Sequence, residues 1–148
     1  MTIRLQACEP GMIPALAELW VDAWRKAYPR IDFERRRDWF TDRIEGFIRD
    51  GVAVIVAFED DQLAGFVTVD PQNGWIDQML VGAEFQGGAA GQALMDEAKR
   101  RVPQGLSLDV NADNARAIAF YRKQGFVRTG GRGNEQSAAI DLMAWTPG

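Results

Sequence analysis

A glycine-rich segment between two apolar runs constrains this chain more than any other feature. The segment is Gln-Gly-Gly-Ala-Ala-Gly at residues 86–91; it follows apolar residues 76–81 and precedes an expected helix over residues 92–102. A chain that passes from a strand through such a turn into a helix leaves several backbone N–H groups unpaired and pointing in one direction. With the positive end of the helix dipole, these donors form a site for phosphate oxygens. The sequence therefore predicts an anion-binding turn.

The composition is that of one ordinary globular domain. The chain has 148 residues, of which 47% are hydrophobic and 26% charged, enough for a sizeable core. No linker or repeat divides it, so we expect a single domain over residues 1–148. Its apolar runs are too short to span a bilayer, and residues 2–7 are typical of a strand rather than a signal peptide. We therefore expect a cytoplasmic protein with no membrane partner.

The residue counts exclude several kinds of site. Histidine is absent and Cys8 is the single cysteine. These counts exclude Ser-His-Asp and Cys-His catalysis, an internal disulfide and His- or thiolate-based zinc sites, so we expect no metal. The net charge of −4 argues against a nucleic-acid partner, because phosphate neutralisation needs clustered Lys and Arg. The short basic runs at residues 35–37 and 99–101 are expected on solvated helix faces.

The hydrophobic pattern predicts an α/β fold. Apolar residues recur at helical spacing up to residue 50, after which β-branched runs and tight turns begin. The expected elements, in order, are a strand at 2–7, helices at 10–27 and 32–50, strands at 52–58, 63–69 and 75–81, a helix at 92–102, a strand at 106–110, a helix at 114–124 closed by Gly125, and a hairpin of 126–129 and 138–145 around residues 130–134. This order predicts a mixed sheet with helices on both faces.

Two blocks of the sequence together resemble a known family. Ile-Asp-Gln-Met-Leu-Val at residues 76–81, followed by the glycine-rich segment, is similar to motif A of the GCN5-related N-acetyltransferases (GNAT), Arg/Gln-x-x-Gly-x-Gly/Ala. Asn-Ala-Arg-Ala-Ile-Ala-Phe-Tyr at residues 114–121, ending in Gly125-Phe126, is similar to motif B. The element order also matches the family fold. A glycine-rich turn alone also serves as a simple strand–helix connection, but the second block at the right distance favours the family.

The resemblance implies acetyl-CoA as the donor, its pyrophosphate held by backbone N–H groups of the turn. Ala89 stands where the family has its first glycine. We expect its methyl group to be tolerated, because alanine in a helical conformation carries no penalty. Asn114 is implied to bind the cofactor arm, or it caps the helix that follows it. The expected cofactor contacts are Met79, Leu80, Val81, Gln86, Gly87, Gly88, Ala89, Ala90, Gly91, Gln92 and Asn114.

The resemblance also implies the proton-transfer groups. Tyr121 stands at the place of the family tyrosine that protonates the departing thiolate, a task that suits a phenol; the alternative is an aromatic residue that packs on the sheet. Some family members have a glutamate at the start of the fourth strand, where this chain has Trp75. Asp77, two residues further along the strand, is the expected general base. Glu84 and water are the alternatives.

The acceptor pocket is implied to lie between the first two helices and the last hairpin. Trp20, Trp24 and Tyr28 are expected to line it and could stack on an aromatic or amphipathic amine. The alternative is that at least one tryptophan belongs to the core. Arg25 and Arg30 are candidates for holding an acceptor carboxylate, although surface solvation explains them equally well.

The resemblance implies direct acetyl transfer from acetyl-CoA to a primary amine of a small molecule or a peptide. The alternative is a CoA-binding module without turnover, which the departure at Ala89 and the open choice of base leave in place. A dinucleotide-binding domain is disfavoured because the early hairpin strands do not belong to a βαβ unit. A homodimer is a candidate assembly that the sequence does not decide.

Overall fold

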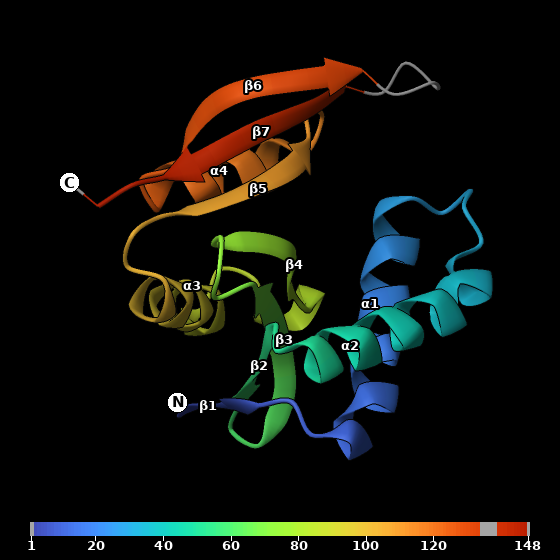
Figure 1. Ribbon diagram of the computed structural model, residues 1–148. Helices are drawn as coiled ribbons and strands as arrows, with labels where there is room; N and C mark the ends of the chain where they lie inside the picture. The colour runs from blue at the N-terminus through green and yellow to red at the C-terminus, as the bar shows by residue number, and fades with distance from the viewer. Residues whose placement is uncertain (1, 134–138, 148) are drawn as a thin grey trace.

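The computed structural model describes residues 2–133 and 139–147. Figure 1 shows its elements in chain order. The strands are β1 (Ile3–Ala7), β2 (Ala53–Glu59), β3 (Gln62–Val69), β4 (Trp75–Val81), β5 (Leu106–Asn111), β6 (Val127–Gly133) and β7 (Ala139–Trp145). The helices are α1 (Ile13–Ala27), α2 (Arg37–Asp50), α3 (Ala89–Arg101) and α4 (Ala115–Lys123), with short 3-10 turns η1 (Pro10–Met12), η2 (Phe33–Arg36) and η3 (Ala83–Phe85).

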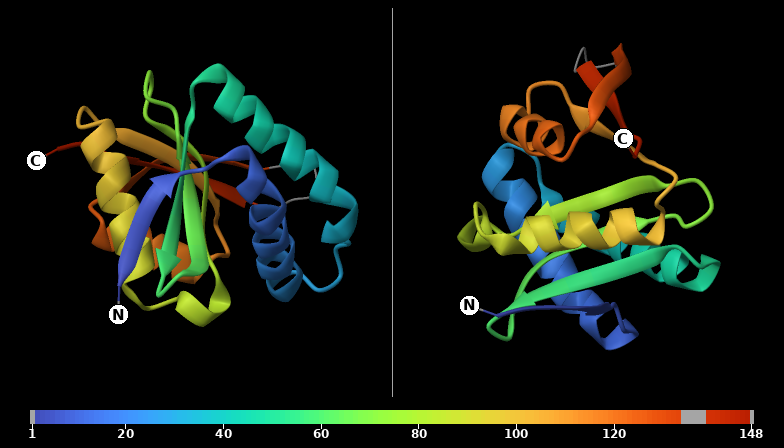
Figure 2. Two further views of the ribbon diagram at one scale, coloured as in Figure 1. Left: turned by 90° about the horizontal axis from the view of Figure 1, so that it is seen from below. Right: turned by 90° about the vertical axis from the view of Figure 1, so that its left-hand side faces the viewer.

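The strands of the described residues form one mixed sheet, as the sequence predicts. Their order is β1-β2-β3-β4-β5-β7-β6, and β4 and β5 are parallel while the other neighbours are antiparallel. One core packs α3 and α4 against the sheet, and another packs α1, η2 and α2 against it. Figure 2 shows α3 on the opposite side of the sheet from α1 and α2. None of the described helices is both long and apolar enough to cross a membrane.

Local chemistry explains most element ends. The Asp32 side chain accepts a hydrogen bond from the Glu34 N–H at 3.1 Å and begins η2, which leads into α2. Gly51, with φ of 85°, ends α2 in the left-handed conformation, and Gly125, with φ of 94°, follows α4 in the same way. Gly51 and Gly125 confirm the expected ends of α2 and α4. The first two helices begin later than expected, at Ile13 and Arg37, because residues 10–12 and 33–36 form 3-10 turns.

Two further boundaries differ from the expected ones by three residues or more. The third helix begins at Ala89 rather than at residue 92, because the backbone of residues 89–91 is already helical. The end of the glycine-rich segment is therefore the first turn of α3. Strand β6 continues to Gly133, where a loop was expected, because its pairing with β7 extends to the Gly133–Ala139 pair. Asn134 and Ala138, which the sequence placed at the hairpin connection and at the start of the last strand, lie outside the described residues.

The neighbouring strands β4 and β5 diverge along their length. Within the described part of the chain they pair only through Trp75 with Ser107 and Ile76 with Leu108. Residues 79–81 still pair with β3. The main chain at this end of β4 is thus free of β5, and the sheet opens there.

A bulge in β4 decides which way its side chains point. The register with β3 places one extra residue of β4 opposite Thr68, and the Gln78 N–H donates to Thr68 Oγ1 at 3.0 Å. The bulge shifts the alternation of side chains. Ile76 and Met79 both pack on the α3 side of the sheet, while Leu80 packs on the α1 side.

Candidate active site

A cleft opens where β4 and β5 diverge. Its volume is about 450 Å³, and it lies between the end of β4, the glycine-rich turn and α4. The residues that line it are Met79, Leu80, Val81, Phe85, Gln86, Gly87, Gly88, Gly91, Gln92, Asn114, Arg116, Ala117, Phe120, Tyr121, Lys123 and Gln124. The two blocks that carry the family resemblance therefore meet in one cavity.

The glycine-rich turn directs a helix N-terminus at this cleft. Gly87 has φ of 83°, a conformation that favours glycine, and Gly88 is the N-cap of α3. Among the described residues no side chain caps α3 at this position. The Gln86 side chain donates from Nε2 to the Val81 carbonyl at 3.2 Å and ties the turn to the end of β4. The backbone N–H groups of the first turn of α3 can therefore bind an anion.

Nine of the residues predicted to bind the cofactor line the cleft, and two lie outside its described lining. The nine are Met79, Leu80, Val81, Gln86, Gly87, Gly88, Gly91, Gln92 and Asn114. The Ala90 side chain is fully buried in the core on the α3 side of the sheet. Ala89 is exposed at the first helical position. Any contact of Ala90 with a ligand is thus restricted to its backbone, whereas the Ala89 methyl group is open to solvent.

Asn114 is the N-cap of α4, one of the two roles that the sequence leaves open. Its Oδ1 accepts a hydrogen bond from the Ala117 N–H at 3.2 Å. Asn114 also lines the cleft, so the cap does not remove it from the site.

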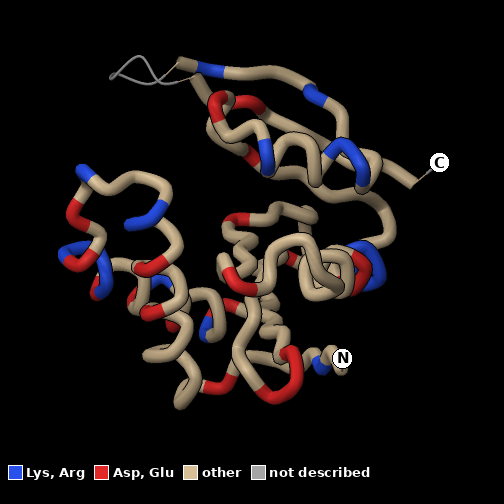
Figure 3. The backbone as a smooth tube through the Cα atoms, turned by 180° about the vertical axis from the view of Figure 1, so that it is seen from behind, with Lys and Arg blue, Asp and Glu red and all other residues tan. Residues whose placement is uncertain are grey.

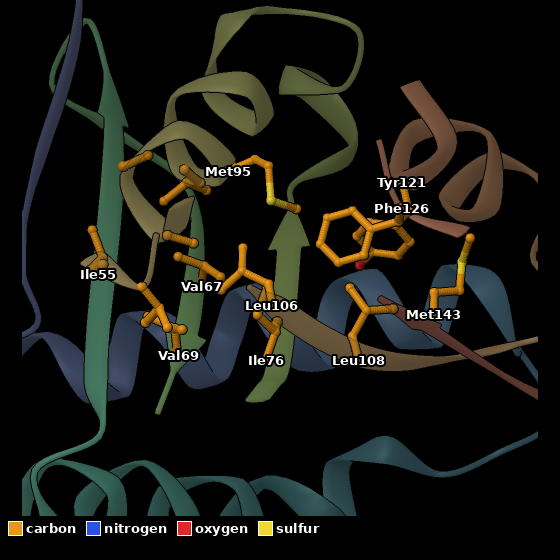
Figure 4. Close-up of a cluster of buried hydrophobic side chains, with 14 of the residues drawn as sticks. Ile55, Val67, Val69, Ile76, Met95, Leu106, Leu108, Tyr121, Phe126 and Met143 are labelled. Carbon is orange, nitrogen blue, oxygen red and sulfur yellow. The ribbon is translucent and has the colours of Figure 1, made fainter. Parts of the chain in front are cut away.

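Tyr121 lies at the inner wall of the cleft. Its residue is 8% exposed, and its ring packs beside Phe126 with the centroids 5.7 Å apart, as Figure 4 shows. Burial raises the pKa of the Tyr121 phenol to about 12, and the negative charge of Asp109 adds to this shift. The phenol is therefore protonated at neutral pH and can act as a proton donor.

The expected general base, Asp77, faces α2. Its carboxylate accepts two hydrogen bonds from Arg43, from Nε at 2.7 Å and from Nη2 at 2.6 Å. Asp77 is not among the described residues that line the cleft. The base role stays a prediction, and the bidentate contact counts against it because it occupies both carboxylate oxygens. Glu84 is exposed and borders a separate cavity of about 300 Å³ beside α1.

A second cavity, of about 660 Å³, lies at the end of α1 and is rich in aromatic side chains. Its lining is Trp20, Trp24, Tyr28, Ile31, Phe33, Arg35, Arg36, Trp39, Asn111 and Asp113. The rings of Trp24 and Tyr28 stack with their centroids 5.6 Å apart. The Tyr28 hydroxyl accepts a hydrogen bond from Asn111 Nδ2 at 3.1 Å, which joins α1 to the end of β5. Trp20 is 4% exposed and belongs to the core while it also lines this cavity, and its role in binding an acceptor stays a prediction.

A third cavity, of about 410 Å³, connects the first two. It shares Leu80, Gln86, Asn114 and Arg116 with the cleft at the glycine-rich turn. With the aromatic cavity it shares Trp24, Tyr28 and Asp113. The three cavities thus form one passage from the N-terminus of α3 to the aromatic side chains of α1.

Sequence reasoning missed five charged residues of this passage. Arg116 lines the cleft and the connecting cavity, and Lys123 lines the cleft. Asp113 lines the connecting and aromatic cavities, and Arg35 and Arg36 line the aromatic cavity. The expected Arg25 instead pairs with Asp22 and lies outside the described lining of the cavity. The sequence shows the basic run at residues 35–37, but which arginine faces the cavity depends on how η2 and α2 pack on α1.

Comparison with known proteins identifies the family of this chain. The acetyltransferase (GNAT) family matches residues 13–126. The peptidyl-lysine N-acetyltransferase YiaC of Escherichia coli (strain K12) is 30% identical over 122 residues, which cover 82% of this chain and 82% of that protein. The peptidyl-lysine N-acetyltransferase YjaB of the same strain is 26% identical over 130 residues, which cover 88% of this chain and 84% of that protein.

Solved structures share the fold. The PaiA N-acetyltransferase from Thermoplasma acidophilum, solved in complex with coenzyme A, superposes with a TM-score of 0.79 at 18% identity over 99% of this chain and 100% of that one. The ribosomal-protein-alanine N-acetyltransferase from Brucella melitensis gives a TM-score of 0.71 at 24% identity over 97% of this chain and 99% of that one. From the matched family and the shared architecture it follows that this chain belongs to the GNAT family of acetyltransferases.

Proposed function

We propose that this chain transfers the acetyl group of acetyl-CoA directly to a primary amine. The donor binds in the cleft at the glycine-rich turn, and the acceptor enters through the aromatic cavity. The observation that carries the proposal is the connecting cavity between them. It shares Leu80, Gln86 and Asn114 with the donor cleft, and Trp24 and Tyr28 with the aromatic cavity. It lets an acyl donor and an amine meet beside the free main chain of β4.

The cleft offers complementary groups to the parts of the donor. Backbone N–H groups from Gln86 to Gln92 hold the pyrophosphate at the N-terminus of α3, where the helix dipole favours negative charge. The main chain of residues 79–81 is free of β5 and binds the pantetheine arm. Asn114 contacts the same arm while it caps α4.

The chemistry is a direct acyl transfer. The neutral amine nitrogen attacks the thioester carbonyl carbon, and a backbone N–H of residues 79–81 stabilises the negative charge that develops on the carbonyl oxygen. The carbon–sulfur bond then breaks, and Tyr121 donates its phenolic proton to the departing thiolate. The proton of the amine passes to water, and Tyr121 is reprotonated from solvent. This route needs no side-chain base, in keeping with the Arg43 contact that occupies Asp77.

Two relatives are named peptidyl-lysine N-acetyltransferases, which favours a primary amine on a peptide or on a small molecule of similar shape. The amine passes Trp24 and Tyr28 on its way to the thioester. A cytoplasmic location, where acetyl-CoA is available, fits this activity.

Two measurements test the proposal. Release of CoA thiol is followed with a panel of primary amines, and acetyl-CoA binding is measured by calorimetry in the same buffer. We expect both binding and amine-dependent thiol release. Tight binding without thiol release for any amine would instead identify a CoA-binding module without turnover.

A further inference from the structure

The aromatic cavity, which is the proposed acceptor site, carries opposite charges at its two ends. Asp113 lies at the end that is shared with the connecting cavity. Arg116 also lines the connecting cavity and the donor cleft, but it is not part of the described lining of the aromatic cavity. Arg35 and Arg36 line the aromatic cavity but not the connecting one. Aromatic side chains fill the distance between them, with Trp24 and Tyr28 stacked near the acidic end. A ligand that spans the cavity therefore meets a carboxylate, then rings, then guanidinium groups.

The arginines near Arg36 in the structure have carboxylate partners. Arg35 Nε lies 3.2 Å from Asp32 Oδ2. Arg37 Nη2 lies 2.8 Å from Glu34 Oε2, and Arg25 Nη1 lies 3.4 Å from the other oxygen of the same carboxylate. Figure 3 shows how basic and acidic residues alternate along the backbone between α1 and α2. The acidic residues of this segment are thus engaged with cations other than Arg36.

Arg36 differs from these arginines. Within residues 2–133 and 139–147 it has no carboxylate within ion-pair distance, and its guanidinium carbon lies 5.3 Å from the centroid of the Phe33 ring. The ring supports the guanidinium at the wall of the cavity and leaves its N–H donors for another partner. A carboxylate is the partner that matches the planar fork of arginine.

Asp113 supplies the complementary group at the other end. It is exposed, and it lies where the connecting cavity begins. A primary amine is mostly an ammonium ion in water at neutral pH, so a carboxylate at this point attracts it toward the donor cleft. The two charges therefore give an incoming ligand an orientation as well as affinity.

We propose that the acceptor is a primary amine with an apolar, aromatic-sized middle and a carboxylate at its far end, which Arg36 binds. The inference rests on the proposed function and names its substrate class. In a small molecule the carboxylate is part of the acceptor itself. In a peptide it belongs to an acidic residue next to the acetylated lysine. Polyamines and lysines in basic sequences are poor acceptors, because their second positive charge would face Arg36.

Three probes of nearly equal shape test the proposal. They are 4-(2-aminoethyl)benzoic acid, its neutral analogue 4-(2-aminoethyl)benzamide, and the diamine 4-(2-aminoethyl)benzylamine. For the unsubstituted protein we expect kcat/KM to be about tenfold higher for the acid than for the amide, as one charge-assisted hydrogen-bond pair allows, and lowest for the diamine. Equal values for all three probes would overturn the inference.

Two variants of Arg36 assign the preference to this residue. Arg36→Gln should remove the difference between acid and amide, and Arg36→Glu should make the diamine a better acceptor than the acid. Arg30→Gln is the matched control, because Arg30 is an exposed neighbour outside the described lining of the cavity. A preference for the acid that survives in Arg36→Gln would contradict the proposal. Far-ultraviolet circular dichroism and thermal unfolding establish that each variant is folded.

A binding measurement keeps the inference separate from the proposed function. Calorimetry of the acid and the amide is carried out against the protein saturated with CoA, which has no acetyl group to transfer, so no turnover takes place. The acid should bind about tenfold more tightly than the amide. If no amine releases thiol, the proposed function fails, yet this comparison still decides for or against the carboxylate site. A pair of pentapeptides with a central lysine followed by glutamate or glutamine shows whether the carboxylate comes from a small acceptor or from a peptide.

Discussion

Arg43 on α2 binds Asp77 in β4 through two parallel hydrogen bonds, one at 2.7 Å and one at 2.6 Å. The Asp77 side chain is 15% exposed and that of Arg43 is 39% exposed. The hydrogen bonds that Arg43 donates to Asp77 raise the pKa of Arg43 above its ordinary value. The guanidinium also lies over the rings of Trp39 and Phe47. The pair thus joins the helix that borders the aromatic cavity to the strand that borders the cleft at the glycine-rich turn.

This pair predicts a structural rather than a catalytic effect of replacing Asp77. Asp77→Asn should lower the free energy of unfolding by about 1–3 kcal/mol, because it weakens hydrogen bonds to a partly buried cation. It should lower kcat less than about tenfold, since general-base catalysis is typically worth more than that. Urea unfolding and steady-state kinetics provide the two values.

The control for Asp77→Asn is Arg43→Gln, which breaks the same pair from the other side. The two substitutions together should destabilise the protein less than the sum of their separate effects, because they remove one shared interaction. A kcat loss of about a hundredfold or more in Asp77→Asn alone would instead assign the base role to Asp77.

Tyr121→Phe should lower the rate of acetyl transfer without weakening the binding of acetyl-CoA. It removes the phenolic proton but keeps the ring that packs beside Phe126. We expect kcat to fall at least about tenfold, as the loss of a general acid does, while the Kd for acetyl-CoA changes little. Stopped-flow thiol release and calorimetry measure the two quantities. An unchanged kcat would remove Tyr121 from the acid role.

Alkaline pH should destabilise the protein through two buried groups. Burial raises the pKa of Tyr121 from 10.0 to about 12 and, together with the charge of Glu9, raises that of Cys8 from 9.0 to about 11. Between pH 9 and 12 the unfolded chain therefore loses these protons before the folded chain does, so stability falls as the pH rises. For Tyr121 alone the loss is about 2 kcal/mol by pH 12.

Urea unfolding at a series of pH values measures this loss. Tyr121→Phe should lack the component between pH 10 and 12, and Cys8→Ala the component between pH 9 and 11. Both variants will have lower stability at neutral pH, so the slope against pH is the quantity to compare. A slope that neither substitution changes would contradict the assignment.

Gly74 lies next to the end of β4 that still pairs with β5, before the two strands diverge. Its φ is 75°, and a Cβ atom at this position would lie 2.2 Å from the Gly105 carbonyl oxygen. Gly74→Ala should cost about 2 kcal/mol or more of stability and weaken acetyl-CoA binding, because β4 and β5 must shift apart where they pair. Gly11→Ala is the control, since a Cβ there meets no atom within 4 Å and the φ is not positive. Equal behaviour of the two variants would show that the contact is unimportant.

The substitution Ala89→Gly tests whether the methyl group of Ala89 affects the binding of acetyl-CoA at the glycine-rich turn. The residue is exposed at the first helical position and its backbone is helical, so Ala89→Gly should leave the acetyl-CoA affinity within about twofold. Gly88→Ala should weaken binding, because its Cβ would lie 3.3 Å from the Phe85 carbonyl oxygen and 3.5 Å from Glu59 Oε1. Calorimetry compares the two variants. A large gain in affinity in Ala89→Gly would show that the methyl group obstructs the pyrophosphate.

Several features follow from the sequence because local chemistry decides them. The left-handed Gly51 and Gly125 end helices, and the turn at Asp60-Asp61 joins two antiparallel strands. The glycine-rich turn leads into the N-terminus of α3 as expected, although the helix begins three residues earlier. Its last residues needed no special backbone conformation, and periodicity alone does not locate the first turn of a helix.

The sequence by itself determined the order of the elements, the glycine-rich turn at the start of α3 and the family, because these depend on residues that are close together in the chain. Only the tertiary structure decided that Asp77 faces Arg43 and that Arg36, rather than Arg25, lines the aromatic cavity. The bulge opposite Thr68 shifts every later side chain of β4 by one face, and strand alternation read from the sequence cannot include it. Which arginine lines the cavity depends on how α1, η2 and α2 pack, because this packing determines which carboxylate lies within ion-pair distance of each arginine.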